Sequence, residues 1–111
     1  MSEETSFVVE DAKYLEKHFR KVGKGWHGIL KTPLLLARDK NIPISQVKEK
    51  FGRLRIYVDG EDKTLDEAIR LAESASGHIC ERCGNSGEIR KNSRGWFKTT
   101  CDECYEGSME E

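Results

Sequence analysis

The chain has 111 residues, of which 36% are hydrophobic and 35% are charged, and its formal net charge is −1. Such a chain forms one small domain, or a small domain with an appendage, and its balanced charge neither requires a nucleic-acid partner nor excludes a local basic patch. It contains no run of about 20 apolar residues, which argues against a membrane span, and its first residues lack the basic start of a signal peptide.

Residues 6–22 carry apolar side chains at spacings of three and four, which predicts an amphipathic helix: Val8, Ala12, Leu15, Phe19 and Val22. A second apolar segment, residues 26–37, is interrupted by Thr32-Pro33. The pattern predicts a helix that starts here, with Thr32 as N-cap and Pro33 at the first helical position. Asn41-Ile42-Pro43 follows as a connector.

The next segment, residues 44–60, changes to a period of two. Leu54, Ile56 and Val58 alternate with polar residues, which predicts a half-buried strand. Residues 47–51 predict a second strand with Gly52 at a turn or bulge, although a helix over 45–51 stays open. The two strands would gather four cations in one neighbourhood, either as a binding surface or as a solvated edge that discourages aggregation: Lys48, Lys50, Arg53 and Arg55.

The segment Thr64-Leu65-Asp66-Glu67 has the pattern of a capping box, which predicts a helix that begins at Thr64. Gly77 suits the left-handed position after the helix ends. The helix would lead directly to Cys80.

Four cysteines form two CxxC pairs, Cys80 with Cys83 and Cys101 with Cys104, separated by seventeen residues. This pattern is typical of zinc, because Zn²⁺ takes four thiolates in a tetrahedron at about 2.3 Å each. Four sulfur ligands leave no position for water, so we expect one structural Zn²⁺. Gly84 would let the first turn reverse while backbone amides point at the sulfurs.

Other interpretations of the cysteines stay open. Two disulfides would require an oxidising compartment, whereas we expect a cytoplasmic protein with reduced thiols. An iron–sulfur cluster can use the same four ligands. His78 could replace a sulfur, although the four cysteines already complete the set.

Residues 87–91 and 95–100 predict a hairpin between the cysteine pairs, with residues 92–94 at its tip. Two cysteine turns joined by a hairpin make a zinc ribbon; if the second pair opens a helix, the module is a treble-clef-like variant. Basic and aromatic residues alternate on this hairpin, as they do on surfaces that bind nucleic acids: Arg90, Lys91, Arg94, Trp96 and Lys98. Alternatively, Trp96 and Phe97 cover the small core of the module.

Three segments of the chain carry a resemblance to other proteins. They are Gly25-Trp26, QVKEKFG (residues 46–52) with the following Leu54-Arg55 and Tyr57, and residues 95–104. Over about three quarters of its length, the chain resembles a group of small bacterial and bacteriophage proteins. The resemblance implies a bacterial cell or a phage-infected host and no particular mechanism.

No nucleophile motif, phosphate loop or carboxylate pair indicates catalysis. A treble clef can serve as a nuclease, but that chemistry needs histidines on the hairpin and helix, and no histidine lies between Cys83 and Cys104. We therefore predict that the chain is not an enzyme.

The sequence thus predicts an α+β fold, with a small α+β domain over residues 1–77 and a four-cysteine zinc ribbon over residues 78–111. The first hypothesis for function is an accessory or regulatory protein that binds another protein, in an immunity, counter-defence or adaptor role. The second is a regulator that binds nucleic acid, and the third is a treble-clef nuclease. No membrane partner or small-molecule substrate is indicated.

Overall fold

A computed structural model describes residues 12–109 of the chain, with side chains to residue 105. Residues 12–19 are helical, and the part of the first predicted helix before them lies outside the described residues. The elements that follow are η1 (Lys24–Trp26), α2 (His27–Asp39), β1 (Ile44–Lys50), β2 (Arg53–Val58), α3 (Lys63–Ser76), β3 (Glu88–Lys91), β4 (Phe97–Thr100) and α4 (Asp102–Met109). The α+β prediction is confirmed. Within residues 12–109, no helix has the length and apolar character that crossing a membrane requires.

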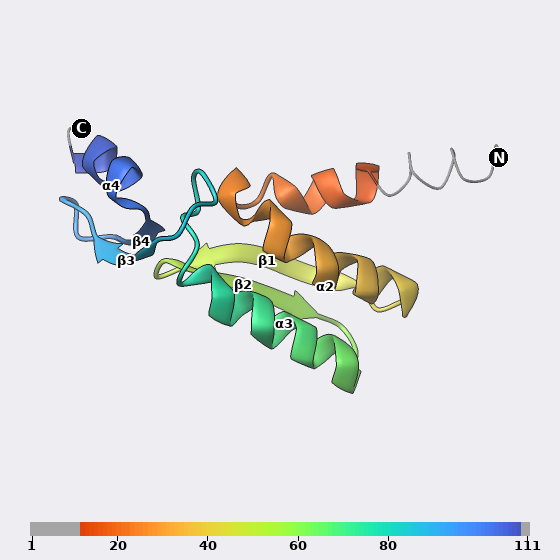
Figure 1. Ribbon diagram of the computed structural model, residues 1–111. Coiled ribbons are helices and arrows are strands. Elements are labelled where there is room, and N and C mark those ends of the chain that lie inside the picture. Colours follow the sequence, from red (N-terminus) through yellow and green to blue (C-terminus); the bar gives the residue numbers. More distant parts are fainter. Residues whose placement is uncertain (1–11, 110–111) are drawn as a thin grey trace.

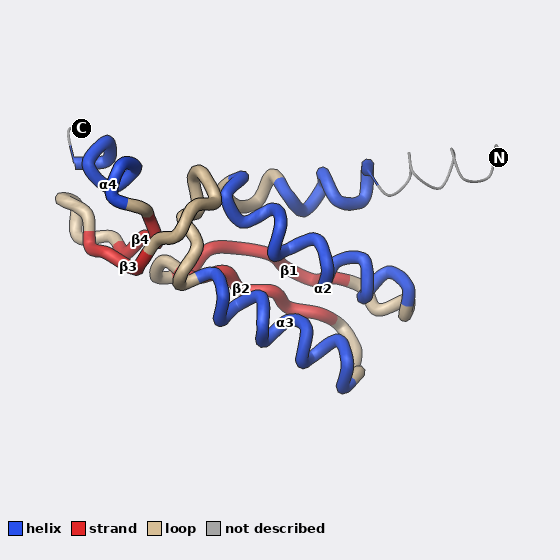
Figure 2. The backbone as a smooth tube through the Cα atoms, viewed as in Figure 1, coloured by secondary structure: helices blue, strands red, loops and turns tan. Residues whose placement is uncertain are grey.

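The molecule is built around the β1–β2 hairpin, and β3, β4 and α4 gather at the end where that hairpin turns (Figure 1). Helices α2 and α3 lie along the hairpin, as the separate helix and strand colours of Figure 2 make clear. We use the term metal module for residues 78–109. The predicted division of the chain at residue 77 stays a prediction.

The hairpin buries one face and leaves the other open. Val47, Leu54 and Ile56 join a single core with side chains of α2 and α3. The outward amides of β2 are satisfied by α3: Leu54 N–H donates to Ser76 Oγ at 2.9 Å, and Ile56 N–H donates to Glu73 Oε2 at 2.9 Å. Helix α3 therefore protects the β2 edge from pairing with another strand.

The predicted start of α2 at Pro33 is wrong. The helix runs from His27 to Asp39 with Pro33 inside it. Leu30, Leu34 and Ala37 are fully buried on one side of this helix. Burial of such an apolar stripe outweighs the roughly 3 kcal/mol that an internal proline costs.

The predicted capping box of α3 is also wrong. Asp62 is the N-cap, and its Oδ2 accepts a hydrogen bond from the Leu65 amide at 2.8 Å. Its other oxygen lies 3.3 Å from Lys40 Nζ, so tertiary contact favours Asp62 over Thr64. At the other end, Gly77 has φ −73° and not the left-handed conformation expected of it.

We expect Asp62→Ala to lower the melting temperature by roughly 5 °C, because a helix N-cap is lost. Thr64→Ala is the matched control and should leave the melt nearly unchanged. The hydrogen bond from Leu65 lowers the pKa of Asp62. The contribution of Asp62 is therefore present at neutral pH and is lost as the pH falls through its folded-state pKa. Thermal melts at neutral and acidic pH test both points, and equal melts for the two variants would contradict the assignment.

Candidate metal centre and binding face

The four cysteines form one cluster although they come from separate parts of the chain. Their sulfur atoms all lie within 4.8 Å of one another, and Cys83 Sγ is 3.6 Å from Cys101 Sγ. A tetrahedral site with metal–sulfur bonds of about 2.3 Å has edges of about 3.8 Å. None of the four cysteines forms a disulfide. Among the described residues, these four cysteines are the group of His, Cys, Asp or Glu side chains that lie close enough together to hold a metal ion. The donor set and its spacing fit a structural metal site.

The local electrostatics also suit a cation. Burial opposes ionisation of Cys80, but backbone N–H groups of Cys101, Cys83 and Arg82 donate to its sulfur and lower its pKa to about 6. Contact with the Cys101 thiol, followed by burial, raises the pKa of Cys104 to about 12. Without a metal, one thiolate thus suppresses the ionisation of its neighbours, and a divalent cation removes that repulsion.

The second cysteine pair lies at the start of a helix. Cys101 directly precedes α4, and Cys104 lies in its first turn. The cysteine cluster is consistent with the predicted zinc ribbon, and the helix after Cys101 is the feature expected of its treble-clef-like variant. In the first pair, Gly84 has φ +87°, so it supplies the reversal expected after Cys83.

The first cysteine turn is packed onto η1. Gly25 N–H donates to the Glu81 carbonyl at 2.8 Å, and Trp26 Nε1 donates to the Ile79 carbonyl at 2.8 Å. Trp26 is fully buried. The segment Gly23–Trp26 thus anchors the metal module to the helical part of the protein.

The turn of the β1–β2 hairpin is packed onto β4. Phe51 has φ +54° and Gly52 has φ +84°, and Lys50 pairs with Arg53, which defines a two-residue type I′ turn. The Thr99 hydroxyl donates to the Gly52 carbonyl. A Cβ at Gly52 would lie 3.2 Å from the backbone nitrogen of Lys98, so the turn and β4 approach closely.

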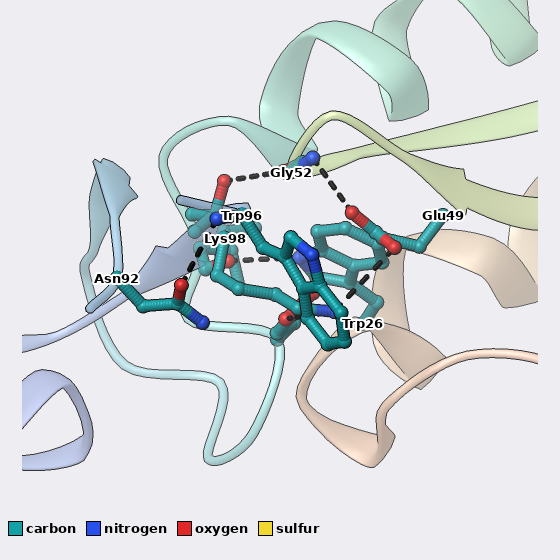
Figure 3. A network of polar contacts seen from close by, with 9 residues as sticks. Trp26, Glu49, Gly52, Asn92, Trp96 and Lys98 are labelled. Atoms are coloured by element: carbon teal, nitrogen blue, oxygen red, sulfur yellow. Dashed lines mark hydrogen bonds and ion pairs between the residues drawn. The ribbon is translucent and has the colours of Figure 1, made fainter. Parts of the chain in front are cut away.

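Three charged residues link the same segments. Lys98 Nζ lies 3.5 Å from Glu49 Oε1 and 3.7 Å from Glu81 Oε2, while Glu49 Oε2 accepts from Gly52 N–H at 2.7 Å (Figure 3). Glu81 is 8% exposed, and burial raises its pKa to about 7 even though Lys98 opposes the shift. Lys98 therefore holds β1, β4 and the first cysteine turn together.

A groove of about 350 Å³ lies where the hairpin turn meets β4. We call it the aromatic groove; it is lined by Glu49, Phe51, Gly95, Trp96, Phe97 and Lys98. Its three rings remain exposed, at 71% for Phe51, 57% for Trp96 and 42% for Phe97. The alternative interpretation, that Trp96 and Phe97 cover the core of the module, is therefore wrong.

The structure divides the predicted binding cations into two groups. Arg90 is 2.6 Å from Asp102, Lys98 is held by Glu49 and Glu81, and Arg55 is 3.7 Å from Glu73. The other group has no carboxylate within salt-bridge distance among the described side chains: Lys48, Lys50, Arg53, Lys91 and Arg94.

Sequence reasoning missed Phe51 as a member of this surface. Its only signal is a bulky aromatic residue directly before a glycine at a predicted turn. Its neighbour in space, Trp96, is 45 positions further along the chain. Only the packing of one hairpin against the other brings the two together.

Comparisons with protein-family models, with curated proteins and with solved structures find no match.

Proposed function

We propose that the chain is a non-enzymatic zinc protein that acts by binding a macromolecular partner, in an accessory or regulatory role. Four thiolates close the coordination shell of a Zn²⁺ ion, so the metal supplies structure and no reacting position. The absence of histidine between Cys83 and Cys104 disfavours the nuclease hypothesis.

The exposed aromatic groove is the observation that carries this proposal. Small soluble proteins rarely leave several large rings in contact with water unless the rings meet a ligand. Here the rings stand on the β1–β2 turn and at the start of β4, which the metal, Lys98 and the Thr99–Gly52 hydrogen bond hold against each other. The metal thus supports the binding face without taking part in binding.

Capture from an extract of the cells that carry the gene tests this function. The wild-type chain should retain a macromolecule, and the double variant Phe51→Asn with Trp96→Ala should lose it. Leu71→Ala is the matched control, because Leu71 is 68% exposed on α3, away from the groove. Equal recovery by wild type and double variant would refute a binding role for the groove. Elemental analysis of the same preparations should find one zinc ion per chain.

A further inference from the structure

We propose that the aromatic groove and the open face of the β1–β2 hairpin together bind single-stranded nucleic acid. This inference rests on the proposed binding function and names its ligand. The bases would stack on Phe51, Trp96 and Phe97, and the phosphates would lie against the cations beside them.

The open face of the hairpin is a basic face. Lys48 pairs with Arg55 and Lys50 pairs with Arg53 across the two strands. Because side chains alternate between faces, all four project on the side opposite Val47 and Leu54. Like charges directly opposite each other destabilise a sheet. Arg55 lies 3.7 Å from Glu73, whereas Lys48, Lys50 and Arg53 have no described carboxylate within salt-bridge distance, and their arrangement is explained if they face a polyanion.

The basic face continues onto the metal module. A Cβ at Gly77 would lie 3.4 Å from Arg53 Nε and 3.6 Å from Ile89 Cδ1, which places Arg53 next to β3. Ile89 and Lys91 share one side of β3, and Lys91 pairs with Phe97 of β4. A strand of nucleic acid that lies along the hairpin would therefore meet Arg53, then Lys91 and the groove.

Each ring of the groove has a cation beside it that pairs with no described carboxylate. Lys50 Nζ lies 5.9 Å from the centre of the Phe51 ring, Lys91 Nζ lies 5.9 Å from that of Phe97, and Arg94 Cζ lies 5.6 Å from that of Trp96. A flat apolar ring next to a cation matches a nucleotide, which joins a flat base to an anionic phosphate. A protein that presents apolar and acidic side chains would also contact rings and cations, so the experiments below are designed to separate the two ligand classes.

Phe51 stands where folding alone favours another residue. The first central position of a type I′ turn prefers Asn, whereas a bulky side chain with positive φ is strained. Phe51, whose backbone has this positive φ, also has the most exposed side chain of the three, at 71%. A strained, exposed side chain in a groove is typical of a functional position.

Fluorescence anisotropy of a labelled oligothymidylate of about 15 nucleotides tests the proposal. The full-length, metal-loaded protein should bind it at low salt, and Phe51→Asn and Trp96→Ala should each weaken binding by roughly 5- to 100-fold. Phe51→Asn should melt at the same or a higher temperature than wild type, so its lost affinity cannot be attributed to misfolding. Leu71→Ala should bind as wild type does. A duplex of the same length should bind more weakly, because its bases are not available for stacking.

Salt and tryptophan fluorescence provide two further readouts. The affinity should fall with rising salt, and Lys91→Ala or Arg94→Ala should make that dependence shallower. Binding should quench the emission of exposed Trp96, while the variant Trp96→Phe, which keeps only buried Trp26, should show little change.

Two results would overturn the proposal: no binding of the oligothymidylate or of the corresponding RNA at low salt, or binding that Phe51→Asn and Trp96→Ala leave unchanged. If the oligonucleotides fail to bind but a protein is captured and lost in the double variant, the ligand class is wrong and the proposed binding function stands. If the capture experiment and the oligonucleotides both fail, both proposals are wrong.

Discussion

Cys83→Ser, or removal of the metal with a chelator, is expected to unfold the metal module. Metal binding in small zinc modules contributes on the order of 10 kcal/mol, which equals the whole stability of many small domains. The few buried apolar residues of the module cannot replace that contribution. Because Gly25 and Trp26 donate hydrogen bonds to carbonyls of the first cysteine turn, the melting temperature of the whole protein should also fall.

Zinc analysis and circular-dichroism melts of the same samples provide the measurement. Arg82→Ser is the matched control, since Arg82 is an exposed residue of the same turn and its side chain is not a metal ligand. It should keep the zinc ion and the wild-type melt. Unchanged zinc content and melting temperature in Cys83→Ser would show that the cysteine cluster is not a metal site.

Gly25→Ala is expected to destabilise the protein by about 3 kcal/mol, because the added methyl group overlaps backbone that cannot move independently. A Cβ at this position would lie well under 3.0 Å from the Cys80 carbonyl and 2.7 Å from the Gly84 nitrogen. Gly25 does not have a positive φ, so the backbone conformation itself would accept alanine. The cost therefore comes from the contact between η1 and the first cysteine turn.

Gly28→Ala provides the opposite expectation. Gly28 lies within α2, and its Cβ would meet no atom within 4 Å. Alanine there should stabilise the protein by about 0.5–1 kcal/mol through helix propensity. Chemical denaturation of the two variants measures both values. If the two substitutions have the same effect, the packing of the metal module against η1 is wrong.

Local patterns accounted for much of this molecule. The alternation from Leu54 to Val58 predicts β2, and Gly52 predicts a turn or bulge before it, of which the structure has the turn. The CxxC pairs predicted the cluster, because a cysteine pair on a tight turn already holds two sulfurs near one point. These features depend on residues close together in the chain.

The errors have a common cause. Pro33 favours a helix start because proline disfavours a helix interior, yet burial of the surrounding leucines overrides that preference. The local motif favours Thr64 as the cap of α3, whereas contact with Lys40, at the C-cap of α2, favours Asp62. In each case a contact distant in the sequence outweighed a local preference of about 1–3 kcal/mol.

By itself, the sequence determined the α+β composition, the cysteine cluster and the presence of basic segments. The tertiary structure alone decided which of those cations pair with acids and which have no carboxylate nearby among the described side chains. It also decided that Phe51 meets Trp96 and Phe97 in one groove. The physical reason is that helix, strand and cysteine-turn signals are local, whereas a binding face depends on how two hairpins pack. Lys98, Gly52 and Gly25 set that packing, and no pattern within either hairpin encodes it.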